Sequence, residues 1–132
     1  MKQVHIFLIT SAKSPGRQKE AWYRYILVCD GKTLDQWEYV KGISGNRLIM
    51  ACAIASLKRM TKPAMITIHT DSYYLTSGHG KLARWKDDGW KRQNKKEVKN
   101  ADLWQQLEAL MRPHAVRFKV EPMEMYMENP PR

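Results

Sequence analysis

The chain has 132 residues, of which 43% are hydrophobic and 27% charged, and its formal net charge is +10. This length predicts a single domain whose core needs no disulfide or metal cross-links. No apolar run approaches the roughly 18 residues of a membrane span, and no secretory signal pattern opens the chain, so we expect a cytoplasmic protein without a membrane segment. Cys29 and Cys52 lie in apolar segments without metal-ligand spacing and are expected to be reduced core thiols.

Three strands are predicted in the first third of the chain. The apolar, β-prone run at residues 4–9 is typical of a buried central strand. Aromatic and β-branched side chains at residues 21–29 indicate a second strand. Asp30-Gly31 then favours a hairpin into a third strand at residues 34–40, antiparallel to the second.

A helix and a fourth strand follow. Residues 47–60 are predicted to form a buried helix, with Ser44 as its N-cap and Pro63 beyond its end. Residues 65–70 have the composition of a strand. Because the chain reaches this strand through a helix, we expect a right-handed crossover that places it parallel to a neighbouring strand.

Two short helical segments are expected next. Residues 72–77 predict a short helix broken at Gly78 and Gly80. Residues 81–86 favour a further helical turn or two.

A polar loop, a helix and a strand complete the order of elements. Residues 89–100 are predicted to form the loop, apolar positions at helical spacing predict a helix over residues 101–112, and residues 116–120 indicate the last strand. The domain then spans residues 1–121. Residues 122–132 show no clear period and are expected to form a loosely ordered tail.

This order of elements predicts an α/β fold. A mixed five-stranded sheet is expected, in which three antiparallel strands are followed by two parallel ones, with helices on its faces. No internal repeat and no long linker divides the chain.

The positive charge is unevenly distributed. Between Lys81 and Lys99, eight Lys or Arg side chains face three acidic ones, so half of the net charge lies in nineteen residues. A polyanionic partner is the physical interpretation that we favour, since each neutralised phosphate releases condensed counterions. The alternative is a solvated basic face that contributes only to solubility.

Four sequence strings carry a family resemblance. They are KQVHIF, GNRLIMACAIASL, HTDSYYL and WKDDGWKRQNKKEVKNADLWQQL. Together with the element order, they resemble the type 1 ribonuclease H family, which cleaves the RNA strand of RNA/DNA hybrids. The resemblance implies a ribonuclease H-like fold and a basic protrusion, formed by the last of these strings, that grips the hybrid. The basic stretch at residues 81–99 is here called the handle.

The same resemblance implies that the catalytic site is degenerate. The family uses four carboxylates to hold two magnesium ions. At the matching positions this chain has Ile9, Ile49 and Asp71, so the resemblance retains the third carboxylate alone. The fourth belongs to a helix after the last strand, and we expect this chain to be truncated before it. We therefore expect no metal ligands and no metal cofactor.

Asp71 has two interpretations. It is either the lone remnant of the family's catalytic site or an acid that caps the helix beginning at Ser72, and we favour the cap. Ile9 and Ile49 fit a disarmed site, because a carboxylate cluster without metal repels itself, whereas branched alkyl groups pack.

The resemblance also implies nucleic-acid contacts. Ser44 and Asn100 match the hydroxyl and the asparagine of a pocket for a DNA-strand phosphate, and Asn46 matches an asparagine at the binding face. In the handle, Trp85 and Trp90 either stack on the nucleic acid or pack the handle's own small core. The expected phosphate contacts of the handle are Lys86, Lys91, Lys95, Lys96 and Lys99.

Three hypotheses about function follow. The leading one is a non-catalytic module that binds duplex nucleic acid, with RNA/DNA hybrid as the first candidate and double-stranded RNA as the second. An alternative is residual metal-dependent ribonuclease H activity through Asp71, or activity completed by a partner or second copy. The third is a protein-interaction scaffold that uses the apolar former active site, including a homodimer that buries Ile9 and Ile49.

Overall fold

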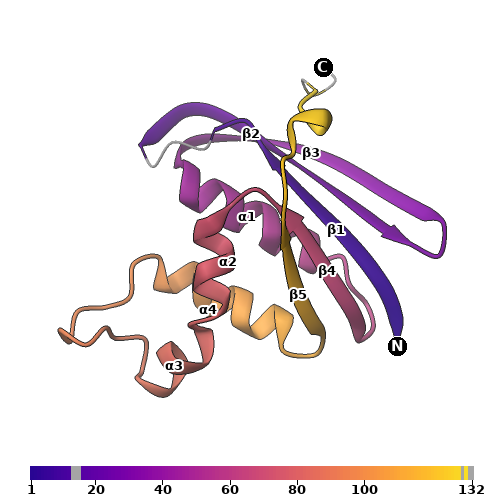
Figure 1. Ribbon diagram of the computed structural model, residues 1–132. Helices are drawn as coiled ribbons and strands as arrows, with labels where there is room; N and C mark the ends of the chain where they lie inside the picture. Colours follow the sequence, from indigo (N-terminus) through magenta and orange to yellow (C-terminus); the bar gives the residue numbers. More distant parts are fainter. Residues whose placement is uncertain (13–15, 129, 131–132) are drawn as a thin grey trace.

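A five-stranded sheet forms the centre of the molecule (Figure 1). The computed structural model describes residues 1–12, 16–128 and 130. The strands are β1 Lys2–Thr10, β2 Arg17–Cys29, β3 Lys32–Ser44, β4 Ala64–Thr70 and β5 Ala115–Val120, in the spatial order β3-β2-β1-β4-β5. Strands β1 to β3 pair antiparallel, and β4 and β5 pair parallel, so the predicted fold class is confirmed.

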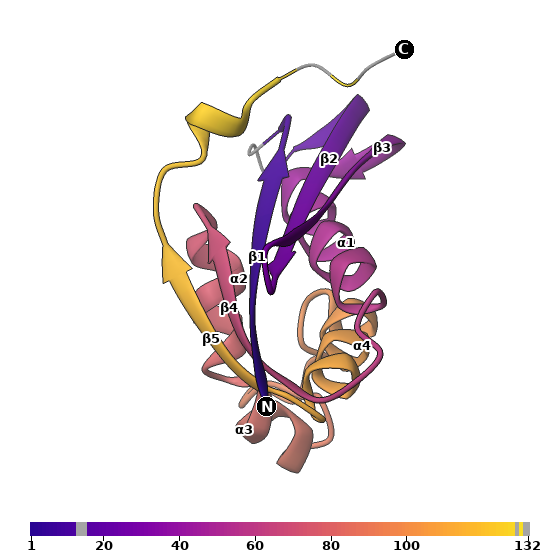
Figure 2. The ribbon, with the colours of Figure 1, turned by 90° about the vertical axis from the view of Figure 1, so that its right-hand side faces the viewer.

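Four α-helices accompany the sheet. They are α1 Gly45–Leu57, α2 Tyr73–His79, α3 Leu82–Asp87 and α4 Ala101–Met111, and a short 3₁₀ turn, η1, spans Glu124–Tyr126. Figure 2 shows α1 and α4 on one side of the sheet. No helix in the described part of the chain is long and apolar enough to cross a membrane.

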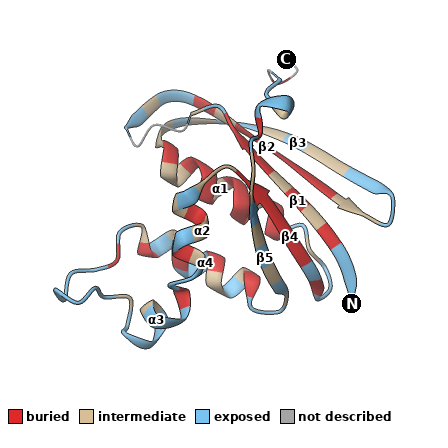
Figure 3. Ribbon diagram, in the orientation of Figure 1, coloured by how far each residue is buried: buried red, intermediate tan, exposed pale blue. Residues whose placement is uncertain are grey.

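The alternation of side chains along β1 explains why the helices gather on one face. Val4, Ile6 and Leu8 point into the main core with the buried side chains of α1 and α4. Phe7 and Ile9 point to the opposite face, where a smaller apolar cluster forms. Strand β1 therefore has apolar side chains packed on both faces of the sheet, and Figure 3 shows it as buried or half-buried over much of its length.

Several predicted boundaries need correction. Helix α1 begins at Gly45, two residues earlier than expected, with Ser44 as the predicted N-cap: its Oγ accepts the Arg47 N–H at 3.3 Å. Strands β2 and β3 are longer than predicted because Arg17 pairs with Ser44 at the far end of the hairpin. This pairing satisfies the backbone of a polar stretch whose composition does not suggest a strand.

Gly78 does not break the first short helix. Helix α2 continues through it to His79, with Gly80 as the C-cap. A Cβ on Gly78 would collide with the ring of Trp104, one of the largest fully buried side chains. The glycine is therefore required for close packing between α2 and α4.

The expectation of a loose tail does not hold for the segment after β5. Met123 is only 1% exposed and packs with Ile9 and Ile26 in the smaller cluster. Arg24 Nη1 donates to the Tyr126 carbonyl at 2.9 Å, and thereby holds this segment against the sheet. The predicted tail residues 129, 131 and 132 lie outside the described part.

Both cysteines are free. Cys52 is buried, as predicted, and burial raises the pKa of its thiol. Cys29 is half-buried at the end of β2.

Candidate nucleic-acid interface

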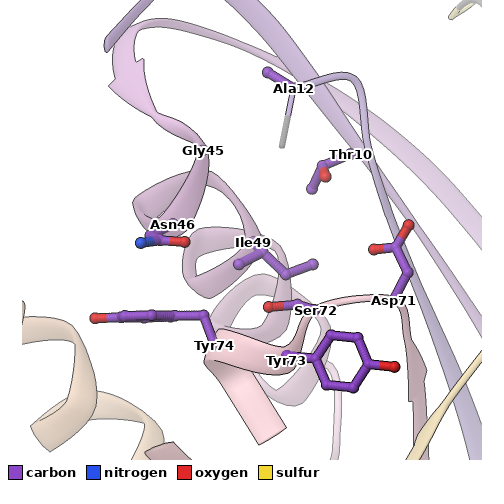
Figure 4. Close-up of a pocket in the computed structure, with 9 residues that line it drawn as sticks. All are labelled: Thr10, Ala12, Gly45, Asn46, Ile49, Asp71, Ser72, Tyr73 and Tyr74. Atoms are coloured by element: carbon purple, nitrogen blue, oxygen red, sulfur yellow. The ribbon is translucent and has the colours of Figure 1, made fainter. Parts of the chain in front are cut away.

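A small cavity lies where β1 and β4 end and where α1 and α2 begin. Its volume is about 190 Å³, and Figure 4 shows Ile49 and Asp71 among its lining residues, together with Thr10 and Asn46. Ile49 belongs to the main core and is only 4% exposed. The cavity thus has an apolar wall from α1 and a polar wall from the ends of the two strands.

Ile9 does not join Ile49 in this cavity. It lies on the opposite face of the sheet, 1% exposed, in the smaller cluster. The two isoleucines therefore form no common exposed apolar surface. This corrects the expectation on which the protein-interaction hypothesis depended, because the chain itself already buries both side chains.

Asp71 is not the helix cap. Ser72 is the N-cap of α2, and its Oγ accepts the Leu75 N–H at 3.0 Å. Thr70 Oγ1 in turn accepts the Ser72 N–H at 3.1 Å. The interpretation of Asp71 as a cap is therefore wrong, and its carboxylate lies at the cavity instead.

Arg47 connects the two residues predicted to bind a phosphate. Its backbone N–H donates to Ser44, and its guanidinium donates to Asn100 Oδ1 at 3.1 Å. The Asn100 amide donates to the Tyr74 hydroxyl at 2.8 Å. Both expected residues thus contact Arg47, Ser44 at its backbone and Asn100 at its guanidinium, and the sequence analysis missed this cation although it directly follows Asn46.

The charge of Arg47 is partly compensated by Asp102. Two hydrogen bonds of 3.0 and 2.7 Å join the guanidinium to both carboxylate oxygens. The hydrogen bond from Arg47 lowers the pKa of Asp102, so this carboxylate is ionised at neutral pH. A phosphate at this place would share Arg47 with Asp102.

The handle projects from the body of the molecule (Figure 1). Its outer part is a small hairpin with a bridge between Lys91 and Glu97. A hydrogen bond of 2.9 Å from the Val98 N–H to the Trp90 carbonyl closes its base, and the Val98 side chain is buried. The position of the hairpin is therefore set by a packed base.

The five predicted handle lysines fall into two groups. Lys86 Nζ lies 2.7 Å from Glu108 Oε1, so it joins α3 to α4. Hydrogen bonds from Arg112 and from Lys86 hold the pKa of Glu108 at about 2. The other lysines are all exposed on the loop after α3, and they are Lys91, Lys95, Lys96 and Lys99.

The handle tryptophans pack against the protein. Trp85 meets Trp104 with ring centroids 5.5 Å apart and planes at 54°. Trp90 is also half-buried against the main core. The contacts favour the packing interpretation for both rings, and any stacking on a ligand would be limited to their exposed parts.

The sequence matches a known protein family over most of its length. The profile of the RNase H family matches residues 2–121. The chain belongs to the RNase H family. A ribonuclease H of Acetivibrio thermocellus is 32% identical over 120 residues, which cover 89% of this chain and 80% of that protein. One from Rhodopseudomonas palustris is 41% identical over 76 residues, or 57% of this chain and 49% of that protein. The chain thus spans about half the length of the first curated relatives that it matches.

Solved structures support the same fold. LC9-RNase H1, described as a type 1 RNase H with the type 2 active-site motif, superposes with a TM-score of 0.73 at 20% identity and covers 90% of this chain and 62% of that one. LC11-RNase H1, solved in complex with RNA/DNA hybrid, has a TM-score of 0.63 at 15% identity over 94% of this chain and 88% of that one. At these identities the likeness concerns the fold alone.

The cleft of this RNase H-family chain does not fit the two-magnesium site implied by the resemblance. Two-metal centres need several carboxylates that hold the ions close together. Asp71 is the one carboxylate among the described residues that line the cavity. Nor does the described part of the chain bring three or more His, Cys, Asp or Glu side chains together at any place suited to a metal ion.

Proposed function

We propose that this chain is a non-catalytic RNase H-family module that binds duplex nucleic acid, with RNA/DNA hybrid as the first ligand and double-stranded RNA as the second. The observation that carries the proposal is a contrast between two parts of the molecule. Alkyl side chains are buried at two positions matched to carboxylates, whereas the handle presents Lys91, Lys95, Lys96 and Lys99 to solvent.

Charge and shape both favour a duplex. Exposed lysines on a hairpin with a packed base provide phosphate contacts that are independent of sequence. Arg47 and Asn100 offer a second place for a phosphate, at the junction of α1 and α4. A ligand that reaches both places must be extended and polyanionic, and a nucleic-acid duplex is such a ligand. A cytoplasmic location and the absence of a resident metal are further parts of the proposal.

A reversal of charge in the handle tests the binding surface. The combined change Lys95→Glu, Lys96→Glu and Lys99→Glu should weaken hybrid binding at least about tenfold and lower the slope of log K against log salt by about 3, since about one counterion is released for each phosphate contact. Fluorescence anisotropy with labelled hybrid, RNA duplex and DNA duplex at several salt concentrations measures both effects.

A matched variant controls for net charge. Lys58→Glu, Arg59→Glu and Lys62→Glu together make the same change of charge in the turn after α1, at the other end of that helix from Ser44. This variant should bind hybrid within about twofold of the parent protein. Equal losses in both variants, or no binding of any duplex by the parent protein at 50 mM salt, would refute a specific handle surface.

The same samples test catalysis. Parent protein incubated with hybrid in magnesium or manganese should leave the RNA strand intact. Cleavage that Asp71→Asn abolishes would instead establish the alternative of a residual metal-dependent nuclease.

A further inference from the structure

A second, larger cavity lies at the other end of the sheet. Thr10, at the end of β1, lines the cavity near Asp71, whereas Lys2 and Val4, at its beginning, line this one. Its volume is about 640 Å³, within the usual range of small-molecule sites. The β2–β3 hairpin and the turn between α1 and β4 form the remaining walls.

The floor of this cavity is apolar, and it is left uncovered because α1 ends before reaching it. Helix α1 ends at Leu57, and residues 59–63 of the turn after it line the cavity. Leu27 and Leu34, which face each other across β2 and β3, thus form a floor together with Val4. Met60, in the turn after α1, contributes a half-buried side wall.

The rim of the cavity is basic. Among the described lining residues, Asp30 is the single acid, and its carboxylate lies 2.8 Å from Lys2 Nζ. Lys32, Arg59 and Lys62 are exposed around the opening. A ligand whose apolar part occupies the cavity would therefore have these cations close to whatever part of it lies at the opening.

We propose that this cavity binds a small amphiphilic anion, with an aliphatic or aromatic body on Leu27 and Leu34 and a single carboxylate or other acidic group at Arg59 and Lys62. A purely polar anion would leave the apolar floor unused, so the floor favours an amphiphile. The site goes beyond the proposed function, because the handle and this cavity lie on different sides of the molecule (Figure 1).

A fluorescent dye, anilinonaphthalene sulfonate, reports occupancy of the cavity. Three competitors of equal chain length and different charge displace it below their aggregation limits: dodecanoate, dodecanol and dodecyltrimethylammonium. Dodecanoate should displace the dye at concentrations at least about tenfold lower than the cationic compound. Equal competition by the anion and the cation would overturn the proposal.

Two variants separate the floor from the rim. Leu34→Trp fills the cavity and should abolish binding of both dodecanoate and dodecanol. Arg59→Glu with Lys62→Glu keeps the floor and should weaken dodecanoate at least about tenfold, while dodecanol changes less than about twofold. Circular dichroism checks that each variant is folded. If Leu34→Trp does not fold, the variant Arg59→Glu with Lys62→Glu still tests the site, because it changes only exposed residues.

The handle provides the matched control. Lys95→Glu with Lys96→Glu makes the same change of charge and should leave dodecanoate binding unchanged, although it weakens hybrid binding. Dodecanoate affinity that falls equally in the handle and rim variants would show that net charge alone attracts the anion and would refute the site.

Discussion

Ile49 packs in the core at the position where the family resemblance places a metal-binding carboxylate. Its side chain is buried in the main core and forms the apolar wall of the cavity near Asp71. A carboxylate there would lose its hydration without gaining the companion acids and ions of a metal site. The isoleucine thus stabilises the fold at the position where the family resemblance places a metal ligand.

Restoring the acid should therefore destabilise the protein. Ile49→Glu is expected to lower the free energy of unfolding by about 3–5 kcal/mol, since it buries a charge without a partner. Ile49→Val, which only shortens the side chain, should cost about 0.5–1.5 kcal/mol. Urea unfolding at neutral pH measures both values. If the Glu variant were as stable as the Val variant, the site would accommodate the family's acid.

Gly78 shows the same dependence on packing. Gly78→Ala should lower the free energy of unfolding by about 1–3 kcal/mol, because the added methyl group overpacks against Trp104. Gly80→Ala is the control, since a Cβ there meets only the Ser77 carbonyl at an ordinary 3.5 Å. Thermal unfolding of both variants measures the difference, and equal melting temperatures would contradict the packing argument.

At the level of elements, Glu108 holds the base of the handle to the body. It lies on α4 and pairs with Lys86 on α3 and with Arg112 at the end of α4, each at 2.7 Å. The handle is therefore attached by a charge cluster as well as by the contact between Trp85 and Trp104.

This cluster predicts a pH dependence. The folded protein holds the pKa of Glu108 at about 2, below its ordinary value of 4.5. Its contribution to stability is thus complete above pH 4.5 and is lost as the pH falls to about 2. Glu108→Gln should show a flatter fall of unfolding free energy across this range than the parent protein. Lys86→Met, which removes one of the two partners, should lie between them, and parallel curves for all three would exclude the cluster.

The whole molecule has two apolar layers, one on each face of the sheet. The helices cover the main core, and the segment after β5 covers Ile9 and Ile26 through Met123. This segment contributes to stability because it excludes water from the second face. Two contacts hold it in place: Glu121 Oε1 lies 2.6 Å from His69 Nδ1, and Arg24 Nη1 donates to the Tyr126 carbonyl at 2.9 Å.

The two methionines of this segment provide a direct comparison. Met123→Ala should lower the free energy of unfolding by about 2–5 kcal/mol, since this side chain is 1% exposed. Met125→Ala, at a side chain that is 74% exposed, should change it by less than about 0.5 kcal/mol. Chemical unfolding of both variants is the measurement. Equal effects would mean that the segment is not packed in solution.

Local signals in the chain predicted the elements well. Strand and helix periods, the Asp30-Gly31 turn and the Ser44 cap depend on neighbours in sequence, and the structure contains each of them. The predictions were wrong where two neighbouring side chains could each cap a helix, or where contact with a residue distant in sequence determines the local structure. Ser72 caps α2 in place of Asp71, and Trp104 makes Gly78 a packing residue inside a helix.

The candidate site was only partly visible in the sequence. Ser44 and Asn100 were named from the family resemblance and stay predictions, and Arg47 was missed because its partners Asn100 and Asp102 lie more than fifty residues away. The handle lysines were found as a group, yet the ion pair that distinguishes Lys86 depends on a glutamate in another helix.

The sequence by itself determined the order of the elements, the family and the basic character of the handle, because periodicity, motif strings and charge are properties of neighbouring residues. Only the tertiary structure decided that Ile9 and Ile49 lie on opposite faces of the sheet, that Met123 closes the second face, and that a basic-rimmed cavity opens beyond the end of α1. These features depend on contacts between residues far apart in the chain, and their physical cause is the burial of apolar surface by whichever segment the fold brings there.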